Sequence, residues 1–173
     1  MNEQHESERG FTLIEFLVVA AIIGILAVFA VYALSTARST ARDAKRLSDI
    51  RSTQASLELY FHDKNTYPVL TEPVALGIIG QTNCLNDSNQ GFTTACDSDS
   101  QNVYMDNVSG QIPNGLDRAV QCSANSNAYC YYGNDTTYRI EFELEKSVPG
   151  TDILRGANCA TPDEITAGKC QAI

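Results

Sequence analysis

The chain opens with a polar stretch and becomes almost wholly apolar between Phe11 and Leu34. At about 1.5 Å per residue, these roughly 24 residues are long enough to cross the hydrocarbon core of a bilayer. A secretory signal peptide has its small-residue cleavage site after the apolar run, whereas here Gly10 comes before it. The pattern therefore predicts a leader over residues 1–10 and a retained membrane or filament-core helix over residues 11–34.

Beyond Leu34 the apolar positions recur at steps of three and four residues, the period of an amphipathic helix, over residues 35–65. No proline or glycine interrupts residues 25–65, so we expect one helix from about Thr12 to Asp63, roughly 80 Å long. The apolar stripe consists of Leu34, Ala37, Ala41, Ala44, Leu47, Ile50, Leu57 and Phe61, and the opposite polar side of Arg42, Lys45, Arg46 and Asp49. A head of about 110 residues is too small to cover such a helix, so its N-terminal half is expected to protrude.

Residues 66–173 are expected to form a globular head on a small antiparallel sheet, which gives the chain an α+β fold. In Thr137–Glu145 apolar residues alternate with charged ones, as in a half-buried strand. The tyrosine-rich run Ala128–Tyr132 precedes it across a Gly-Asn-Asp turn, so the two runs predict a hairpin.

The rest of the head gives a weaker pattern. The apolar side of the hairpin is expected to pack on the helix near Leu47, Ile50 and Leu57. Residues 69–115, rich in Gly, Asn, Asp and Ser, predict mainly loop. The tail from Pro149 shows little periodicity and is expected to be held by its cysteines.

All six cysteines lie in the predicted head: Cys84, Cys96, Cys122, Cys130, Cys159 and Cys170. None has CxxC spacing, and His62 is the one histidine beyond the leader, which disfavours a zinc site. An even count in an exported domain favours disulfides and therefore an oxidising compartment. The spacing leaves the pairing open, but sequential pairing closes short loops and is preferred.

The net charge of −9 bears on possible partners. An acidic head repels phosphate, so we expect no nucleic-acid binding by the head. Five basic residues follow the apolar segment: Arg38, Arg42, Lys45, Arg46 and Arg51. We interpret them as a solvated or subunit-contacting helix face, with contact to DNA or anionic lipid as the alternative.

Glu15 lies inside the apolar segment, where a carboxylate costs about 2.5–3.5 kcal/mol on insertion scales and usually marks a function. No cation lies nearby in this segment. Cleavage after Gly10 would create an amine on Phe11, and that amine, on the same or a neighbouring subunit, is a suitable partner.

The motif that contains this glutamate is GFTLIE, residues 10–15. It resembles the prepilin peptidase motif of type IV pilins and type II secretion pseudopilins, and the resemblance covers about residues 10–70. The resemblance implies cleavage after Gly10, N-methylation of Phe11, and pairing of Glu15 with the amine of an adjacent subunit. It implies as partners copies of the chain or related pilins, prepilin peptidase, an inner-membrane platform protein and its ATPase.

The sequence departs from the family pattern in two places. Its leader carries Glu3, Glu6 and Glu8 against Arg9, whereas family leaders are usually basic, and Tyr32 stands where a proline is common. By the positive-inside rule, the basic residues after the apolar segment would favour a cytoplasmic head. The cysteines and the cleavage motif both require a head outside, and we follow them.

The one metal-like feature is an acidic run that begins at Asp97 and Asp99 and is followed by Asp106. Its alternating oxygen ligands resemble the opening of a calcium loop, but the glycine and glutamate of an EF-hand are missing. Major pseudopilins of type II secretion bind calcium in the head, so a calcium site and a solvated acidic turn are both retained. No nucleophile elbow, phosphate loop or metalloprotease motif occurs, and we expect no enzymatic activity.

These features predict a structural subunit of a type IV pilus-like filament. The precursor is expected in the cytoplasmic membrane with its head outside, and the assembled form at the cell surface. A pseudopilin of type II secretion, in a periplasmic filament, is the alternative within the family. A membrane-anchored extracellular binding module is the alternative from another class.

Overall fold

The computed structural model describes residues 10–88, 91–96 and 102–171. Contacts divide the chain into two units, Met1–Arg38 and Ser39–Ile173, and helix α1 (Leu13–Lys64) contributes to both. The helix begins and ends within one residue of the predicted bounds, and it continues through Tyr32 without a break. The long helix expected from the sequence is thereby confirmed.

In the first unit, α1 is apolar all round. Every described residue from Gly10 to Arg38 is exposed, and the large apolar side chains of the run lie between 45% exposed at Val19 and 77% at Leu13. A helix that is apolar on all sides is stable in water only when something covers it. The described chain does not supply that cover.

The C-terminus of α1 is closed by Asn65, which has the positive φ of 55° that is common at the end of helices. Its backbone N–H donates to the carbonyl of Phe61 at 2.7 Å. Tyr67 and Pro68 then lead the chain into the sheet.

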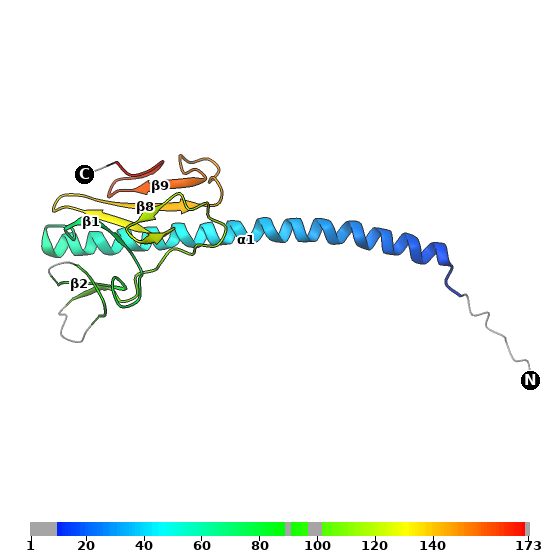
Figure 1. Cartoon of the computed structure of the whole chain (residues 1–173), viewed down its shortest axis with the longest axis horizontal. Coiled ribbons are helices and arrows are strands. Elements are labelled where there is room, and N and C mark those ends of the chain that lie inside the picture. The colour runs from blue at the N-terminus through cyan, green and yellow to red at the C-terminus, as the bar shows by residue number, and fades with distance from the viewer. Residues whose placement is uncertain (1–9, 89–90, 97–101, 172–173) are drawn as a thin grey trace, which may run out of the picture. The chain divides into compact units, whose positions relative to one another are not determined.

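The main sheet of the second unit has five antiparallel strands in the order β1-β7-β8-β9-β10 (Figure 1). Its strands are β1 (Leu70–Ala75), β7 (Cys130–Gly133), β8 (Tyr138–Leu144), β9 (Gly156–Ala160) and β10 (Ile165–Ala167). The predicted hairpin is confirmed as β7 and β8, which pair from Cys130 with Glu141 to Gly133 with Tyr138. The antiparallel α+β head is therefore as expected.

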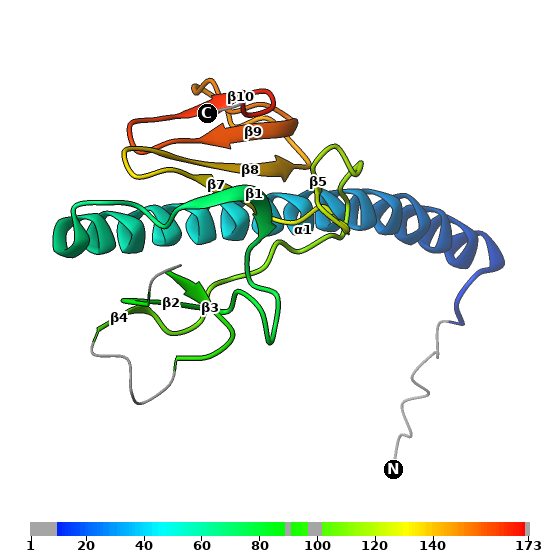
Figure 2. The same ribbon diagram turned by 60° about the vertical axis from the view of Figure 1, so that its left-hand side comes forward.

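Two smaller sheets complete the head. Their strands are β2 (Cys84–Asn86), β3 (Phe92–Thr93) and β4 (Val103–Met105) in one, and β5 (Gln121–Cys122) and β6 (Asn125–Ser126) in the other. The sheet with β2 lies on a different side of α1 from β8 and β9 in both views (Figures 1 and 2). Residues 69–115 are mainly irregular where the structure describes them, as predicted, but they also contain β1 to β4. These strands were not predicted, because they are too short to show a clear period and form through pairing with other segments.

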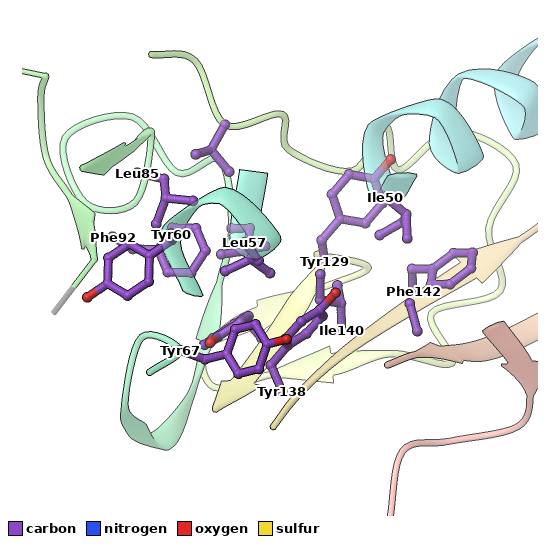
Figure 3. Close-up of a cluster of buried hydrophobic side chains, with 14 of the residues drawn as sticks. Ile50, Leu57, Tyr60, Tyr67, Leu85, Phe92, Tyr129, Tyr138, Ile140 and Phe142 are labelled. Carbon is purple, nitrogen blue, oxygen red and sulfur yellow. The ribbon is translucent and has the colours of Figure 1, made fainter. Parts of the chain in front are cut away.

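The core joins the helix to the main sheet (Figure 3). Ile50 and Leu57 of α1 are completely buried, and they share a cluster with Tyr138, Ile140 and Phe142 of β8. Leu47 packs at the margin of the same cluster. The predicted packing of the hairpin on the helix is confirmed.

The buried face of α1 nevertheless differs from the predicted apolar stripe. Arg46 and Asp49, assigned to the polar side, are 0% and 7% exposed, whereas Ala41 and Ala44 are exposed. Buried charge is tolerated where it is paired and hydrogen-bonded. The helix therefore lies rotated from the orientation that hydrophobicity alone indicates, and Arg46 is not part of a solvated basic face.

Strand β8 was expected to be buried on one side only, and this was wrong. Glu141 and Glu143 are 5% and 1% exposed, because loops cover the second face of the sheet. The carboxylate of Glu143 accepts hydrogen bonds from the backbone N–H groups of Asp117 and Ala119, and that of Glu141 accepts one from Cys170. The alternating sequence pattern predicted that the carboxylates of Glu141 and Glu143 face water. They are buried instead, and both accept hydrogen bonds from backbone N–H groups.

Three disulfides cross-link the head: Cys84–Cys96, Cys122–Cys130 and Cys159–Cys170. They are the sequential pairs preferred from the short loops. The first joins β2 to the segment after β3, and the second joins β5 to β7. The third holds the tail against β9.

Candidate functional site

The segment around Gly10 and Phe11 precedes the helix. Both residues are exposed and lie outside regular secondary structure, and α1 begins only at Leu13. A Cβ added at Gly10 would meet nothing within 4 Å, and Phe11 is 73% exposed. The peptide bond between them is therefore open to an approaching enzyme.

Thr12 and Glu15 close the N-terminus of α1 by a capping box. The backbone N–H of Thr12 donates to Oε2 of Glu15 at 3.2 Å, and the Thr12 hydroxyl donates to the same oxygen at 3.0 Å. In return the backbone N–H of Glu15 donates to Oγ1 of Thr12 at 3.3 Å. This reciprocal pattern satisfies donors that a helix start leaves without a partner, and a carboxylate there interacts favourably with the helix dipole.

The capping box adds a local role to the residue singled out from the sequence. Glu15 fixes where the helix starts, which keeps the Gly10–Phe11 bond in extended chain. Cleavage there would place a cationic amine directly before Thr12, so the same carboxylate would gain a charged donor. Threonine followed three residues later by glutamate is the sequence signal of this cap, and the sequence reasoning did not use it.

A second polar cluster lies within the head and was not predicted. The guanidinium of Arg46 is fully buried and donates to Oδ1 of Asp43 at 2.7 Å and to Oε1 of Glu145 at 2.8 Å. It also donates to the backbone carbonyls of Ile112 and Asn114, each at 2.7 Å. One side chain thus joins the helix, the end of β8 and a loop.

Arg42 completes this charge cluster by holding both carboxylate oxygens of Glu145, each at 2.7 Å. Hydrogen bonds from Arg42, and then from Arg46, lower the pKa of Glu145 below its ordinary value of 4.5. Asp43 accepts the backbone N–H groups of Glu145 and Lys146 at 3.0 and 2.9 Å. Two cations and two anions balance here, so Arg42 and Arg46 contribute no net charge to the head surface.

The loop that covers this cluster approaches it closely at Gly115. This residue has a φ of 80°, and a Cβ there would lie 2.0 Å from Oε2 of Glu145. Only glycine fits a position that combines this conformation with such a short approach.

The predicted calcium ligands are not brought together by the described part of the head. Asp97 and Asp99 lie outside the described residues, and Asp106 is exposed. Among the residues that are described, no group of three or more His, Cys, Asp or Glu side chains is arranged to hold a metal ion. Calcium binding stays a prediction.

One helix among the described residues is long and apolar enough to cross a membrane. It is α1, with a mean hydropathy of 2.9 over its most apolar window near the N-terminus. The capping box and the exposed peptide bond lie directly before this window.

Comparison with known proteins finds relatives for the N-terminal region. Residues 7–31 match the family described as the prokaryotic N-terminal methylation motif. Type II secretion system core protein G of Pectobacterium carotovorum is 43% identical over 61 residues, which are 35% of this chain and 39% of that protein. The proteins of the same name from Klebsiella michiganensis and Escherichia coli are 40% and 37% identical over 65 and 67 residues, or 38% and 39% of this chain.

The match covers 46% of each of the latter two proteins, so the chain spans less than half the length of these three relatives. No solved structure matches the chain. The methylation motif matches where the open Gly10–Phe11 bond and the Thr12–Glu15 cap lie. The N-terminal region of the chain is therefore similar to that of type II secretion pseudopilins and carries the prokaryotic N-terminal methylation motif.

Proposed function

We propose that the chain is a structural, non-enzymatic subunit of a type IV pilus-like filament, matured by cleavage after Gly10 and polymerised through α1. The observation that carries the proposal is Glu15. It is a carboxylate in the first turn of an apolar helix, immediately after an exposed cleavage motif. A simple anchor would gain only the helix cap from this carboxylate, and an uncharged capping residue supplies a cap without the cost of inserting a charge.

The proposed pathway starts from a precursor in the cytoplasmic membrane with its head outside. Prepilin peptidase removes residues 1–10 and methylates Phe11, and a platform protein with its ATPase draws the subunit into the filament. The three disulfides support an oxidising compartment for the head.

Assembly would solve the problem posed by the exposed helix. Apolar side chains of residues 11–34 bury one another when the helices of many copies bundle, and each buried apolar side chain contributes about 1.5–3 kcal/mol. Such burial does not itself fix the axial position of one helix against the next. A pair between Glu15 and the Phe11 amine of a neighbour would set that register, because a helix shifted from it leaves a charge without a partner.

A second candidate within the same family is a pseudopilin of type II secretion. It is favoured by the relatives, which are named as core protein G of that system. The two functions differ in where the filament stands, at the cell surface or in the periplasm.

The experiment that tests the proposal is mass spectrometry of the intact protein from sheared surface material and from membranes. We expect a chain that begins at N-methylated Phe11 and is lighter by two hydrogens for each disulfide. Its presence in the sheared fraction would favour a pilus, and its restriction to membranes a pseudopilus. A wild-type chain that still carries residues 1–10 would refute the proposal and leave a simple membrane anchor.

A substitution separates a filament subunit from an anchored binding module. Glu15→Ala should abolish filaments while the protein remains in the membrane, because register is lost and membrane insertion becomes easier. Glu72→Ala, which removes an exposed carboxylate from β1, is the matched control and should leave filaments unchanged. Filaments of the Glu15→Ala protein at the wild-type level would contradict the assembly role.

A further inference from the structure

Ile79 is the most exposed of the large apolar side chains in the described part of the chain, at 91%. It lies in the connection between β1 and β2 (Figure 2), in a head whose other apolar residues are mostly buried. The segment Gly77–Thr82 carries no charged residue. An isoleucine presented in this way is suited to enter an apolar site on another molecule.

The turn that presents Ile79 is held in place by its own hydrogen bonds. The backbone N–H groups of Gln81 and Thr82 donate to the carbonyl of Ile78 at 3.0 and 2.9 Å. The Thr82 hydroxyl donates to the carbonyl of Ala75 at 2.6 Å and accepts the N–H of Ile78 at 3.2 Å. The backbone that carries the side chain is therefore held in place before any contact forms, which lowers the entropy cost of binding.

A complementary apolar groove lies elsewhere on the head. It has a volume of about 310 Å³, and its walls are α1 near Ala44 and Leu47 and the turn after β8 near Val148 and Pro149. Leu47 and Val148 also pack against the main core, so the floor of the groove is continuous with it. The groove has room for a branched aliphatic side chain.

The two walls of the groove are tied together by Asp43. Its carboxylate accepts the backbone N–H groups of Glu145 and Lys146, directly before the turn. The backbone N–H of Val148 donates to the carbonyl of Ile153 at 2.9 Å, which closes the turn. The groove is thus preformed, like the turn that carries Ile79.

We propose that Ile79 of one copy docks in the groove formed by Ala44, Leu47, Val148 and Pro149 of a neighbouring copy. The inference rests on the proposed function, since it assigns a head-to-head contact within the filament. The groove is also lined by Lys146 and by Asp43, and Asp43 is already paired with Arg46. An uncharged turn that enters the groove brings no further charge into the contact. The occupant cannot be Ile79 of the same copy, because there it is 91% exposed.

The contact joins two different surfaces of identical chains. Such a heterologous contact does not close on itself in a pair, and when repeated it generates an open helical assembly. This is the geometry that a filament of one repeated subunit requires, and it favours a second copy over an unrelated partner.

The test uses the full chain in cells that assemble filaments, with the amount of sheared filament as the readout. Ile79→Asp and Val148→Asp should each lower it about tenfold or more, as the loss of one buried aliphatic side chain implies. Val69→Asp is the matched control, because Val69 is 47% exposed but lies away from both surfaces, and it should retain the wild-type amount. Equal membrane levels and intact disulfides exclude misfolding as the cause.

Two further measurements examine the contact itself. Val148→Lys combined with Ile79→Asp should restore filaments relative to Ile79→Asp alone, because the new charges pair across the contact. A photoreactive phenylalanine analogue at Ser147, which lines the groove, should capture a segment that contains Ile79 from another copy.

The outcomes separate this inference from the function on which it rests. Wild-type yields for Ile79→Asp and Val148→Asp, or capture of a segment without Ile79 in wild-type-like filaments, would overturn the inference alone. An absence of filaments from wild-type cells and membranes would overturn both.

Discussion

Arg46 is a fully buried cation that joins the helix to Glu145 and to the backbone carbonyls of Ile112 and Asn114. Its substitution by methionine would keep much of its volume but leave Asp43 and Glu145 buried near one cation fewer. Removal of one partner from a buried charge cluster typically costs about 3–5 kcal/mol. We therefore expect Arg46→Met to lower the free energy of unfolding of the head by about that amount, measured by denaturant unfolding of the full chain in detergent.

Lys45 provides the control for this prediction. It also forms an ion pair, with Asp49 at 3.0 Å, but its side chain is 56% exposed. Exposed pairs contribute about 0–1 kcal/mol, so Lys45→Met should change stability little. Equal losses for the two variants would contradict the role assigned to the buried cluster.

Glu145 predicts a dependence of stability on pH. Its pKa in the folded head is lowered, first by Arg42 and then by Arg46. A carboxyl with a lowered folded pKa contributes its stability above the unfolded value, near 4.5, and loses it as the pH falls through the folded pKa. Melting temperatures measured from pH 7 downward should therefore fall below about pH 4.5, and Glu145→Gln should flatten this fall.

Glu141 should behave in the opposite way. Burial raises its pKa, so its charged form opposes folding above that pKa and its protonation in acid adds stability. Glu141→Gln should remove this gain in acid and leave the loss due to Glu145. If Glu141→Gln instead reduced the loss of melting temperature at low pH, the roles assigned to Glu141 and Glu145 would be wrong.

Sequence reasoning identified some functional residues and missed others for a definite reason. Glu15 was found because a charge among apolar residues is conspicuous in the sequence itself. Arg46, Glu141 and Glu143 were assigned to water because each lies where the local period places polar side chains. Their burial depends on loops and strands far away in the chain, and no local pattern contains that information.

The same division holds among the elements. Helix α1 and the β7–β8 hairpin are long enough for the spacing of their apolar residues to indicate the type of structure. Both were predicted with nearly correct bounds. The short strands β2 to β4, the inner strand β9 and the edge strand β10 were not predicted. Their backbone groups are satisfied only after distant segments meet, so composition was a poor guide to them.

The edge of the main sheet depends on the disulfide Cys159–Cys170. This bond holds the tail against β9, and the backbone N–H of Cys170 donates to the buried Glu141. Replacement of both cysteines by alanine should lower the free energy of unfolding by about 2–4 kcal/mol, as is typical for a native disulfide. Denaturant unfolding measures this loss.

Limited proteolysis adds a local readout to the same variant. The tail after β9 should become the first site of cleavage once it is released. The alanine replacements of Cys84 and Cys96 serve as control, because that bond lies in the β2 sheet and should leave the tail protected. An unchanged tail in the first variant would mean that β10 alone holds this edge.

For the whole molecule, the folded structure distributes charge differently from the single basic helix face that the sequence indicated. The basic residues after the apolar segment do not form one exposed patch, since Arg42 and Arg46 are balanced by Asp43 and Glu145, and Lys45 lies against Asp49. Arg38 and Arg51 are exposed members of the basic cluster outside these ion pairs. That the head does not bind nucleic acid stays a prediction from its net acidic charge.

The charge cluster also has a consequence for biosynthesis. Glu145 follows Arg46 by 99 positions in the chain. At a translation rate of about 5–20 residues per second, Arg46 leaves the ribosome roughly 5–20 s before its partner is made. Throughout that interval Asp43 is the one carboxylate of the cluster beside two arginines, and the helix lacks the sheet that buries it. The head thus completes its fold late, when its last third has been synthesised, and the timing is set by a residue near the C-terminus.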